Sequence, residues 1–507
     1  MSHRCSSSSS WTSLLLIAVG FCLGCPPADP EADAGAPEPD AGTVKTDGGV
    51  VVDDDAGAAP DGGDVVDAGG PPSPGDAGTA PGCAPVTTFA DDAAPTRHVH
   101  VAVDGTDSNG CGAENMPCAT IEAAAREATP GTAVVVHAGQ YAADNYVGNL
   151  HGTADAPIWI GGAEGEARPV IVGGSQALHL SQARYVVVHD LEVSGPSANG
   201  INADDGALYD DPDAARHLVF RNLFIHDVGT GNNDCLKLSG LDDFYVLDSQ
   251  FERCGGGGSG SGVDHVGCHH GVLGGNAFIG DPEAGNAIQC KGGSEDLLIV
   301  GNLITDPGQR AVNMGGSTGD AFFRPPLSTT SPNVEARDIR VVSNVIVGGV
   351  ASLAFVGCDD CLAAHNTIVH PENWVFRILQ ERVSDDTYAF VASGNSRVVN
   401  NLIVFNRGDL STWVNVGGNT APETFTFAHN LWFAADDPSA STPTLPVDEA
   451  NGIYGQDPGI DVDNDDYTID ATSPAAGQGA PDANVVVDHA GACFRMPPSI
   501  GAFEVTD

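Results

Sequence analysis

Leu297-Leu298-Ile299-Val300-Gly301-Asn302-Leu303-Ile304 is a short apolar strand followed by a turn, an asparagine and a second apolar pair. This pattern recurs about nine times. The asparagines of the copies are Asn222, Asn276, Asn302, Asn344, Asn366, Asn401 and Asn430, with Asp190 and Ser249 in the same place in two more. The steps from Asn222 to Ser249, Asn276 and Asn302 are nearly equal, and the later steps vary more. A near-constant period of this length with strand-type alternation predicts a solenoid of β coils.

The recurring asparagine has a structural explanation. Each copy is too short to bury its own apolar face, so neighbouring coils must supply the core. An asparagine at the same turn of every coil can hydrogen-bond along the stack and tolerates the left-handed backbone that such turns need. We therefore interpret these residues as an asparagine ladder and assign no chemistry to them.

Composition limits the choice of partners. The chain has 507 residues, 41% of them hydrophobic, and a formal net charge of −48. This length supports a large core. The negative charge argues against nucleic acid and anionic membranes as partners. The sequence carries no oligomerisation signal, and we expect a monomer.

The N-terminal part differs from the rest. Residues 1–25 have the basic start and short apolar stretch of a secretory signal, and the end of this segment resembles a bacterial lipobox with Cys25 as the acylated residue. Residues 26–82 are acidic and low in complexity, with Asp-Ala-Gly repeated five times, which predicts a disordered linker. Residues 83–507 form the predicted folded domain. We expect an exported protein that is secreted or is lipid-anchored at the outer membrane or cell surface.

Both ends of the folded part carry family features. Thr120 can cap an Ala-rich helix at residues 122–128, and residues 134–141 are the first expected strand. A helix in this place would cover an open sheet edge. The block resembles the opening of right-handed parallel β-helix proteins of the pectate-lyase-like class. Ile500-Gly501-Ala502-Phe503-Glu504 resembles the closing segment of bacterial members. The resemblance implies an all-β, right-handed parallel β-helix with a short N-terminal capping helix, and leaves the function open.

The cysteines agree with export, where disulfides persist. Ten lie in the folded part. Cys111 and Cys118 share one loop, and Cys358 and Cys361 share another, so we predict two local disulfides.

Polar residues that follow the repeats are predicted to share one outer face. Lys237 lies as far after Asn222 as Lys291 lies after Asn276, and Asp264 lies at the same offset from Ser249 in the coil between them. Arg310 aligns with Asn286, and Asn313 with Gln289. Ile288, Cys290, Leu236 and Leu238 would then point inward. The residues of the predicted outer face are Asp234, Lys237, Asp264, Gln289, Lys291, Arg310, Asn313 and Arg377.

Cations on an acidic protein suggest a uronic-acid polysaccharide as the ligand. Cleavage of such a glycan by β-elimination needs a group that neutralises the C6 carboxylate and a base that removes the C5 proton. Lys291 followed by Arg310 resembles the Lys and Arg pair of β-helix lyases that act on alginate and dermatan-type chains. We predict Lys291 as the base and Arg310 as the carboxylate partner. Substrate contacts would come from Lys237, Gln289, Asn313 and Arg377.

Other functions remain open. Asp234 and Asp264 could bind calcium, the pattern of lyases with a lone lysine base. The same two residues could be the acid and base of a glycoside hydrolase, since Asn232-Asn233-Asp234 resembles one polygalacturonase motif, although the others are missing. The alternative from a different class is a non-catalytic surface protein that binds glycans or envelope material.

Three further features have two interpretations each. The loop from Gly315 to Pro326 is either a groove wall or a lid over an apolar edge. Trp374 and Trp413 are either stacking platforms or core residues. His265, His269 and His270 could bind a transition metal, but adjacent histidines on a strand point to opposite faces. We therefore interpret these histidines as structural.

Overall fold

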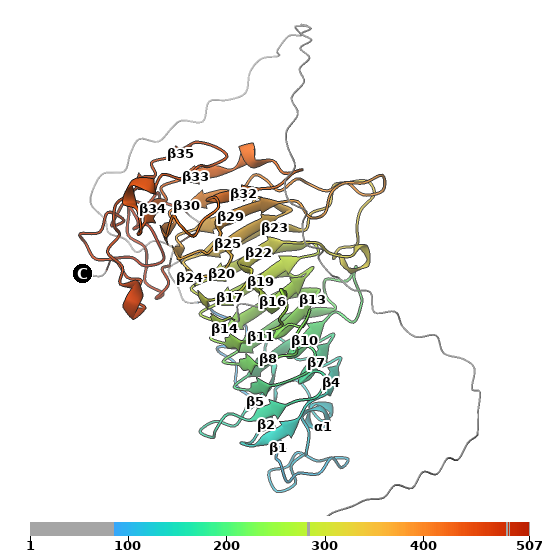
Figure 1. Ribbon diagram of the computed structural model, residues 1–507. Coiled ribbons are helices and arrows are strands. Elements are labelled where there is room, and N and C mark those ends of the chain that lie inside the picture. Colours follow the sequence, from blue (N-terminus) through green and yellow to red (C-terminus); the bar gives the residue numbers. More distant parts are fainter. Residues whose placement is uncertain (1–85, 281–283, 483–484, 486, 506–507) are drawn as a thin grey trace, which may run out of the picture. The chain divides into compact units, whose positions relative to one another are not determined.

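The computed structural model describes residues 86–280, 284–482, 485 and 487–505. Within these residues the chain winds through three sheets, and every strand pair is parallel. Each coil contributes one strand to each sheet, so strands far apart in sequence lie side by side (Figure 1). The chain therefore has the parallel β-helix fold that the repeats predicted.

The strands are grouped here by sheet, as far as the described residues show them. The 14-stranded sheet contains β1 (Arg97–Val101), β2 (Thr132–Val136), β5 (Ile158–Gly162), β8 (Arg184–His189), β11 (Ala215–Arg221), β14 (Leu241–Leu247), β17 (His269–Gly274), β20 (Ser294–Val300), β23 (Ala336–Val342), β26 (Cys358–Asp359), β27 (Leu362–Ala364), β30 (Arg397–Val399), β33 (Thr426–Ala428) and β35 (Glu449–Ala450). The 12-stranded sheet contains β3 (Gln140–Ala142), β6 (Val170–Val172), β9 (Glu192–Ser194), β12 (Phe224–His226), β15 (Gln250–Glu252), β18 (Ala277–Ile279), β21 (Leu303–Thr305), β24 (Val345–Val347), β28 (Thr367–Val369), β31 (Leu402–Phe405), β34 (Leu431–Ala434) and β36 (Ile453–Tyr454). The 10-stranded sheet contains β4 (Asn145–Gly148), β7 (Leu178–Ser181), β10 (Ile201–Asp204), β13 (Leu236–Ser239), β16 (Ser259–Val266), β19 (Ala284–Lys291), β22 (Arg310–Gly315), β25 (Ala351–Val356), β29 (Trp374–Leu379) and β32 (Val414–Val416). Short 3-10 turns occur at η1 (Asp320–Phe322), η2 (Pro422–Thr424), η3 (Pro438–Ala440) and η4 (Val462–Asn464).

One helix caps the N-terminal end of the coils. It is α1 (Ile121–Arg126), and the Thr120 side chain accepts a hydrogen bond of 3.1 Å from the Ala123 amide, as predicted. The helix packs on β1, β2 and β4, so it covers the edge of the 10-stranded sheet. The expected first strand at residues 134–141 is wrong in two respects. β1 precedes the helix, and the expected strand is divided between β2 and β3, which belong to different sheets.

The asparagine ladder is present from Asn276 to Asn430. Each asparagine side-chain oxygen accepts a hydrogen bond from the backbone amide of the preceding coil, at 2.9–3.0 Å. The ladder residues are fully buried. At its C-terminal end, Asn430 donates to the Glu449 carboxylate at 2.7 Å. Burial raises the pKa of Glu449, which also accepts a hydrogen bond from Trp432.

The places predicted for Asn222 and Asp190 are off by one residue. Strand register pairs Arg221 with Leu247 and Leu247 with Gly274, so Leu223 holds the ladder position in that coil, level with Ser249 and Asn276. Asn222 and Asp190 instead occupy the turn position just before the ladder position. That residue is left-handed in successive coils, with φ of 52° at both. Asn and Asp both favour this left-handed backbone, which explains why the turn position and the ladder position look alike in sequence.

Segments near both ends of the described chain pack on the outside of two sheets. Phe89 lies against Tyr185 and His217 on the 14-stranded sheet. The described residues between 458 and 505 return across strands that include β31 and β34 of the 12-stranded sheet. The same segment also reaches β23, β27 and β30 of the 14-stranded sheet. The segment that resembles a closing segment in sequence therefore covers the outside of these two sheets.

Three disulfides join two described cysteines each. Cys111–Cys118 and Cys358–Cys361 confirm the two local predictions. Cys235–Cys254 joins the start of β13 to the chain after β15 and was not predicted. In the part of the chain that the structure describes, no helix is long and apolar enough to cross a membrane. The predicted signal, Cys25 and the linker at 26–82 lie outside the described residues.

Replacing Asn302 by Ala should lower the free energy of unfolding by about 1–3 kcal/mol, because the buried Asn276 amide loses its acceptor. Urea unfolding followed by tryptophan fluorescence measures this. Asn464→Ala is the control, since Asn464 is exposed and bonds only within its own turn at Asp461; its effect should stay within about 0.5 kcal/mol. Equal midpoints for the two variants would contradict the ladder's role.

Candidate functional site

The candidate site lies on the outer face of the 10-stranded sheet. Register between successive strands aligns one outward position of every strand into a continuous line, here called the outer row. Leu236, Leu238, Ile288 and Cys290 are buried in the core on the other side, as predicted. The outer row consists of Tyr146, His179, Asn202, Lys237, Asp264, Gln289, Asn313, Ala354, Arg377 and Asn415.

Four charged residues form a compact group, here called the lysine–aspartate cluster: Asp234, Lys237, Asp264 and Lys291. Nζ of Lys237 donates to Oδ2 of Asp264 and lies 3.5 Å from Oδ2 of Asp234. Nζ of Lys291 lies 4.0 Å from the same oxygen of Asp264. The two ammonium groups therefore converge on one carboxylate oxygen. Oδ1 of Asp264 is buried without a hydrogen-bond partner among the described residues.

The pKa values of three cluster residues are shifted in different ways. Burial and the nearby charge of Asp264 raise the pKa of Asp234 to about 6. Burial acts in the same direction on Asp264, but the charges of Lys237 and Lys291 outweigh it and hold the pKa of Asp264 below its usual value. Burial opposes the charge of Lys237, yet Asp264 and Asp234 raise the pKa of that ammonium. At neutral pH, Asp264 and Lys237 are therefore both charged.

The predicted position of Lys291 is off by two residues. Lys237 and Asp264 are in register, but Asp264 pairs with Gln289, and Lys291 pairs with Val266. The cause is coil length, because the stretch from Asn276 to Gln289 is shorter than the one from Ser249 to Asp264. A shift of two keeps a side chain on the same face of a strand, so Lys291 still lies on the outer side.

Arg310 lies on the outer side, where it contacts Asn313 of the outer row, but it is not adjacent to Lys291. Asn286 pairs with Arg310 and Gln289 with Asn313, as predicted. Lys291 thus lies five residues further along its strand than Asn286, the partner of Arg310. At about 3.3 Å per residue this is roughly 17 Å along the sheet. Arg310 donates to Asn313 at 2.9 Å and pairs with Glu381 at 3.2 Å.

Arg377 extends the face toward the C-terminal coils. Its Nε donates to Asn415 at 3.1 Å, and its guanidinium lies 4.3 Å from the centre of the Trp374 ring. Trp374 is in the column of Asn286 and Arg310 and is therefore on the outer side. Trp413 instead packs against the core cluster. Of the two tryptophans considered as platforms, Trp374 has the suitable position.

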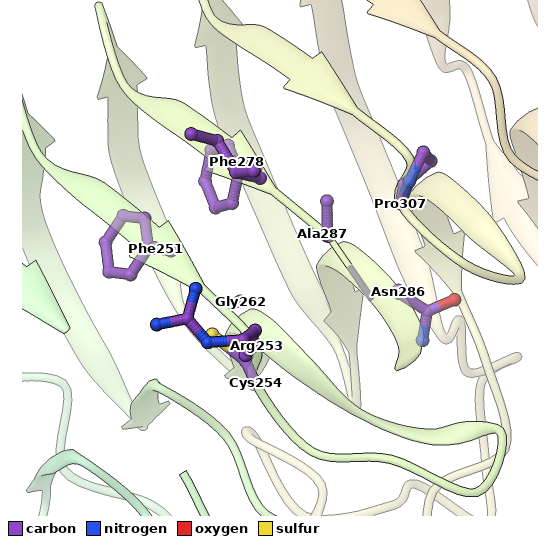
Figure 2. A pocket seen from close by; sticks show the side chains of 10 residues that line it. Phe251, Arg253, Cys254, Gly262, Phe278, Asn286, Ala287 and Pro307 are labelled. Carbon is purple, nitrogen blue, oxygen red and sulfur yellow. The ribbon is translucent and has the colours of Figure 1, made fainter. Parts of the chain in front are cut away.

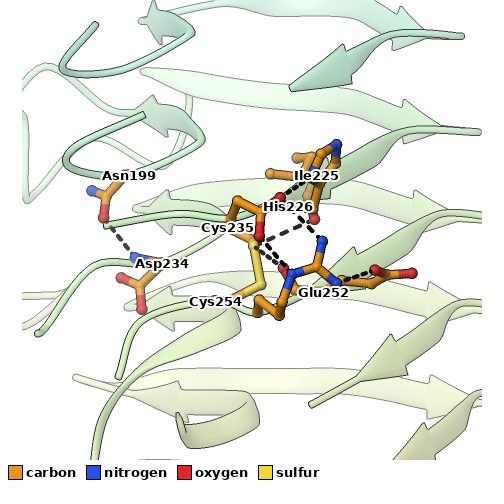
Figure 3. The surroundings of a disulfide bond; sticks show 9 residues. Asn199, Ile225, His226, Asp234, Cys235, Glu252 and Cys254 are labelled. Atoms are coloured by element: carbon orange, nitrogen blue, oxygen red, sulfur yellow. Dashed lines mark hydrogen bonds and ion pairs between the residues drawn. A yellow bond between two sulfur atoms is a disulfide. The ribbon is translucent and has the colours of Figure 1, made fainter. Parts of the chain in front are cut away.

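Asp234 is held by the chain on both sides. Figure 3 shows it next to the Cys235–Cys254 disulfide, where its backbone amide donates to Oδ1 of Asn199 at 2.8 Å. The disulfide ties the start of β13 to the chain that follows β15. It therefore limits the movement of Asp234 relative to the chain after β15.

The loop after β22 passes over Lys291 of the cluster and over Gln289 beside it. A Cβ on Gly316 would lie 2.9 Å from the Gln289 amide and 3.4 Å from Cδ of Lys291, so the loop backbone passes directly over both side chains. Arg324 anchors the loop through two hydrogen bonds to Asp205, at 2.7 and 3.0 Å. Phe323 is buried, whereas Phe322 is exposed. The loop is thus a cover over charged residues, with one aromatic ring left outside.

Calcium does not fit the cluster in this arrangement. The two carboxylates proposed as ligands already face Lys237, and Lys291 adds a second positive charge. A divalent cation would have to displace an ammonium group. We assign calcium no step here, and the prediction stays untested.

The three histidines near Asp264 lie in different surroundings. His265 points into the core, where Nδ1 contacts the Gln289 carbonyl, and burial lowers its pKa to about 4. His269 contacts the Gly293 carbonyl, and His270 pairs with Asp242 on the 14-stranded sheet. No site among the described residues draws on all three.

A cavity beside the start of β19 is too small for a substrate. It is lined by Phe251, Phe278 and Asn286 among others (Figure 2) and has a volume of about 20 Å³. That volume holds about one water molecule. The outer row remains the candidate surface.

Sequence reasoning missed the N-terminal part of the outer row. Tyr146, His179 and Asn202 are not the lysines or arginines that stand out on an acidic chain. Their coils also lack the ladder asparagine that set the alignment. The signal that could have found them is the left-handed turn residue, which continues through Asp190.

No family model and no curated protein matches the sequence. Similar solved structures include pectate lyase Pel9A, at 16% identity and a TM-score of 0.47, covering 82% of this chain and 98% of that chain. An alginate lyase from Paenibacillus sp. str. FPU-7 has 15% identity and a TM-score of 0.42, covering 64% and 99%. The GH136 lacto-N-biosidase from Eubacterium ramulus has 14% identity and a TM-score of 0.42, covering 71% and 68%. Such values carry no argument about activity, so function is argued from this chain's own residues.

Replacing Lys237 by Met should destabilise the protein by about 3–5 kcal/mol at pH 8, because it leaves two buried carboxylates without their main counter-charge. The carboxyl pKa values in the folded variant then rise above the unfolded value. Stability linked to a raised carboxyl pKa is lost as pH rises through that pKa. The deficit should therefore shrink from pH 8 to pH 5.

Urea midpoints at several pH values check this prediction. Arg126→Met, which removes an exposed pair with Glu122, is the control and should cost less than about 0.5 kcal/mol at every pH. A deficit for Lys237→Met that does not change with pH would contradict the assigned charges.

Proposed function

We propose that the protein binds an acidic polysaccharide on the outer face of the 10-stranded sheet and cleaves it by β-elimination at the lysine–aspartate cluster. The supporting observation is that Lys237 and Lys291 converge on Oδ2 of Asp264. Both lysines of the folded part thus meet at one point of a chain with a net charge of −48. A uronate carboxylate is the ligand that such a pair attracts.

The two lysines take different roles. Lys237 is hydrogen-bonded to Asp264 and kept protonated, so it is suited to neutralise the C6 carboxylate of a bound uronate. Lys291 is 4.0 Å from Asp264, beyond hydrogen-bond distance, so its nitrogen is less firmly held. It is the group assigned to accept the C5 proton.

The reaction moves two electron pairs and one proton. Lys291 first gives its ammonium proton to water and then takes the C5 proton, and the C5–H electrons form the C4=C5 double bond. The C4–O bond breaks, and its electrons remain on the leaving oxygen, which takes a proton from the protonated Lys291 or from water. Lys237 stabilises the charge that develops on the carboxylate. Lys291 returns to the neutral form when the proton leaves.

Arg310 does not take the role first expected. Its separation from Lys291 by about 17 Å along the sheet exceeds the reach of one sugar unit. We therefore assign Arg310 no part in the cleavage at Lys291. The sugar contacts predicted at Gln289, Asn313 and Arg377 lie on the covered side of the cluster, where Asn313 is buried, so they are not carried into this proposal.

Export and anchoring are part of the proposal. Three disulfides among the described cysteines support a location outside the reducing cytosol. Attachment through a lipid on Cys25, with the acidic linker as a tether, would place the β-helix at the cell surface. Under that proposal the membrane contact is confined to the lipid.

Hydrolysis is the second candidate. Asp234, with its pKa raised to about 6, and the ionised Asp264 have the unequal proton affinities that an acid and base pair needs. Against this, both carboxyl side chains are only 3% exposed, whereas the side chains of Lys237 and Lys291 are 20% and 10% exposed. A hydrolase would release reducing ends without an unsaturated product, and Asp234→Asn would stop it.

The full-length protein should release product with the ultraviolet absorbance of a C4=C5 double bond from at least one of pectate, alginate and glycosaminoglycans. Lys291→Ala should reduce the rate at least 100-fold, because the base is removed. Lys291→Arg should be as inactive, since arginine keeps the charge but does not deprotonate. Arg337→Ala is the matched control and should keep the full rate, because Arg337 lies on the 14-stranded sheet and pairs with Asp359 at 3.3 Å.

Each other outcome has a definite meaning. Full activity in Lys291→Arg would show that the side chain acts only as a cation. New reducing ends without absorbance would favour the hydrolase. Binding of a glycan without any product, from a folded sample, would favour the non-catalytic surface protein.

A further inference from the structure

The outer row continues past the cluster toward α1. Lys237 pairs with Asn202, Asn202 with His179 and His179 with Tyr146, one residue per coil. Tyr146 is 54% exposed. In the opposite direction the row is covered, because Asn313 and Ala354 are buried. The open part of the row is therefore the part on the N-terminal side of the cluster.

His179 is held in a fixed orientation on this open part. Its Nε2 lies 2.6 Å from Oδ2 of Asp204. That carboxylate also accepts hydrogen bonds from Ser181 at 2.7 Å, from Asn202 at 3.1 Å and from the Gly206 amide at 2.9 Å. Nδ1 of His179 has no hydrogen-bond partner among the described residues. The side chain is 29% exposed, so this nitrogen can bond to a ligand.

Tyr146 adds an aromatic surface at the end of the row. Its ring lies edge-on to His179, with 5.1 Å between ring centres. It also lines a cavity of about 650 Å³ between the end of α1 and β4. An exposed ring next to a fixed hydrogen-bonding group is the usual combination for holding a sugar, which offers one apolar face and a rim of hydroxyls.

We propose that Asn202, His179 and Tyr146 form three consecutive sugar-binding subsites that lead from the lysine–aspartate cluster to the cavity at α1. This inference rests on the proposed function and adds the path of the glycan. Strands of a sheet lie about 4.8 Å apart, which is close to the advance per unit of an extended glycan, so each coil would hold one sugar. The covered row beyond the cluster leaves room for the chain on one side only.

The test measures binding without turnover. In the Lys291→Ala background, calorimetry gives dissociation constants for saturated oligogalacturonates, oligomannuronates and glycosaminoglycan oligosaccharides of two to six units. Affinity for one series should rise up to about four units, the cluster plus three subsites. Adding His179→Ala should weaken binding of trimers and longer oligomers about tenfold, and adding Tyr146→Ala should do so from the tetramer on, with dimers unchanged.

Two variants make the result specific. His226→Ala is the matched control, because His226 also pairs with an aspartate, Asp227 at 2.6 Å, but lies on the 12-stranded sheet. It should bind all lengths as the Lys291→Ala parent does. Tyr146→Phe keeps the ring and should restore the affinity for tetramers.

The outcomes separate this inference from the proposed function. If no series binds at any length either to the Lys291→Ala parent or to Lys291→Arg, which keeps the charge, the proposed function is overturned and the subsites with it. If a series binds but its length dependence is unchanged in His179→Ala and Tyr146→Ala, the subsites alone are overturned. Equal weakening in His226→Ala would also overturn them, since it would show a general effect of removing a surface histidine.

Discussion

The register between successive coils is the constraint on which the rest depends. It is fixed at one turn by buried asparagines, each of which bonds to the backbone of the preceding coil from Asn276 to Asn430. A buried amide that loses its partner costs free energy, so a slip of one coil against the next is unfavourable. Because register is fixed, residues separated by a whole coil in sequence become neighbours on the surface. The outer row is the direct result.

The charged cluster follows from this placement. Lys237 and Asp264 are a whole coil apart in sequence but adjacent in register. The two acids and two lysines compensate one another in a place that water reaches poorly, which is why their proton affinities separate. Lys237 is fixed by hydrogen bonding and Lys291 is not. That difference between two chemically identical side chains is what the proposed chemistry uses.

Sequence predicted the fold, the ladder from Asn276 onward and the face that carries the site. It did so because a repeated turn residue marks the same point of each coil. It was wrong where the turn position before the ladder also carries an asparagine, as at Asn222. It was also wrong where coil length changes, as before Lys291. Cys235–Cys254 and the pair of His179 with Asp204 depend on how adjacent coils meet. Neither has a fixed spacing that sequence alone reveals.

The loops between strands vary while the rows do not. The step from Asn302 to Asn344 is much longer than the step from Asn344 to Asn366, yet the strands on either side keep their register. In a stack of this kind a coil contacts only its two neighbours. A substitution at one outward position therefore alters one point of the outer row without disturbing the others. Such a surface can be revised one coil at a time over evolution, so its specificity can drift while its architecture stays constant.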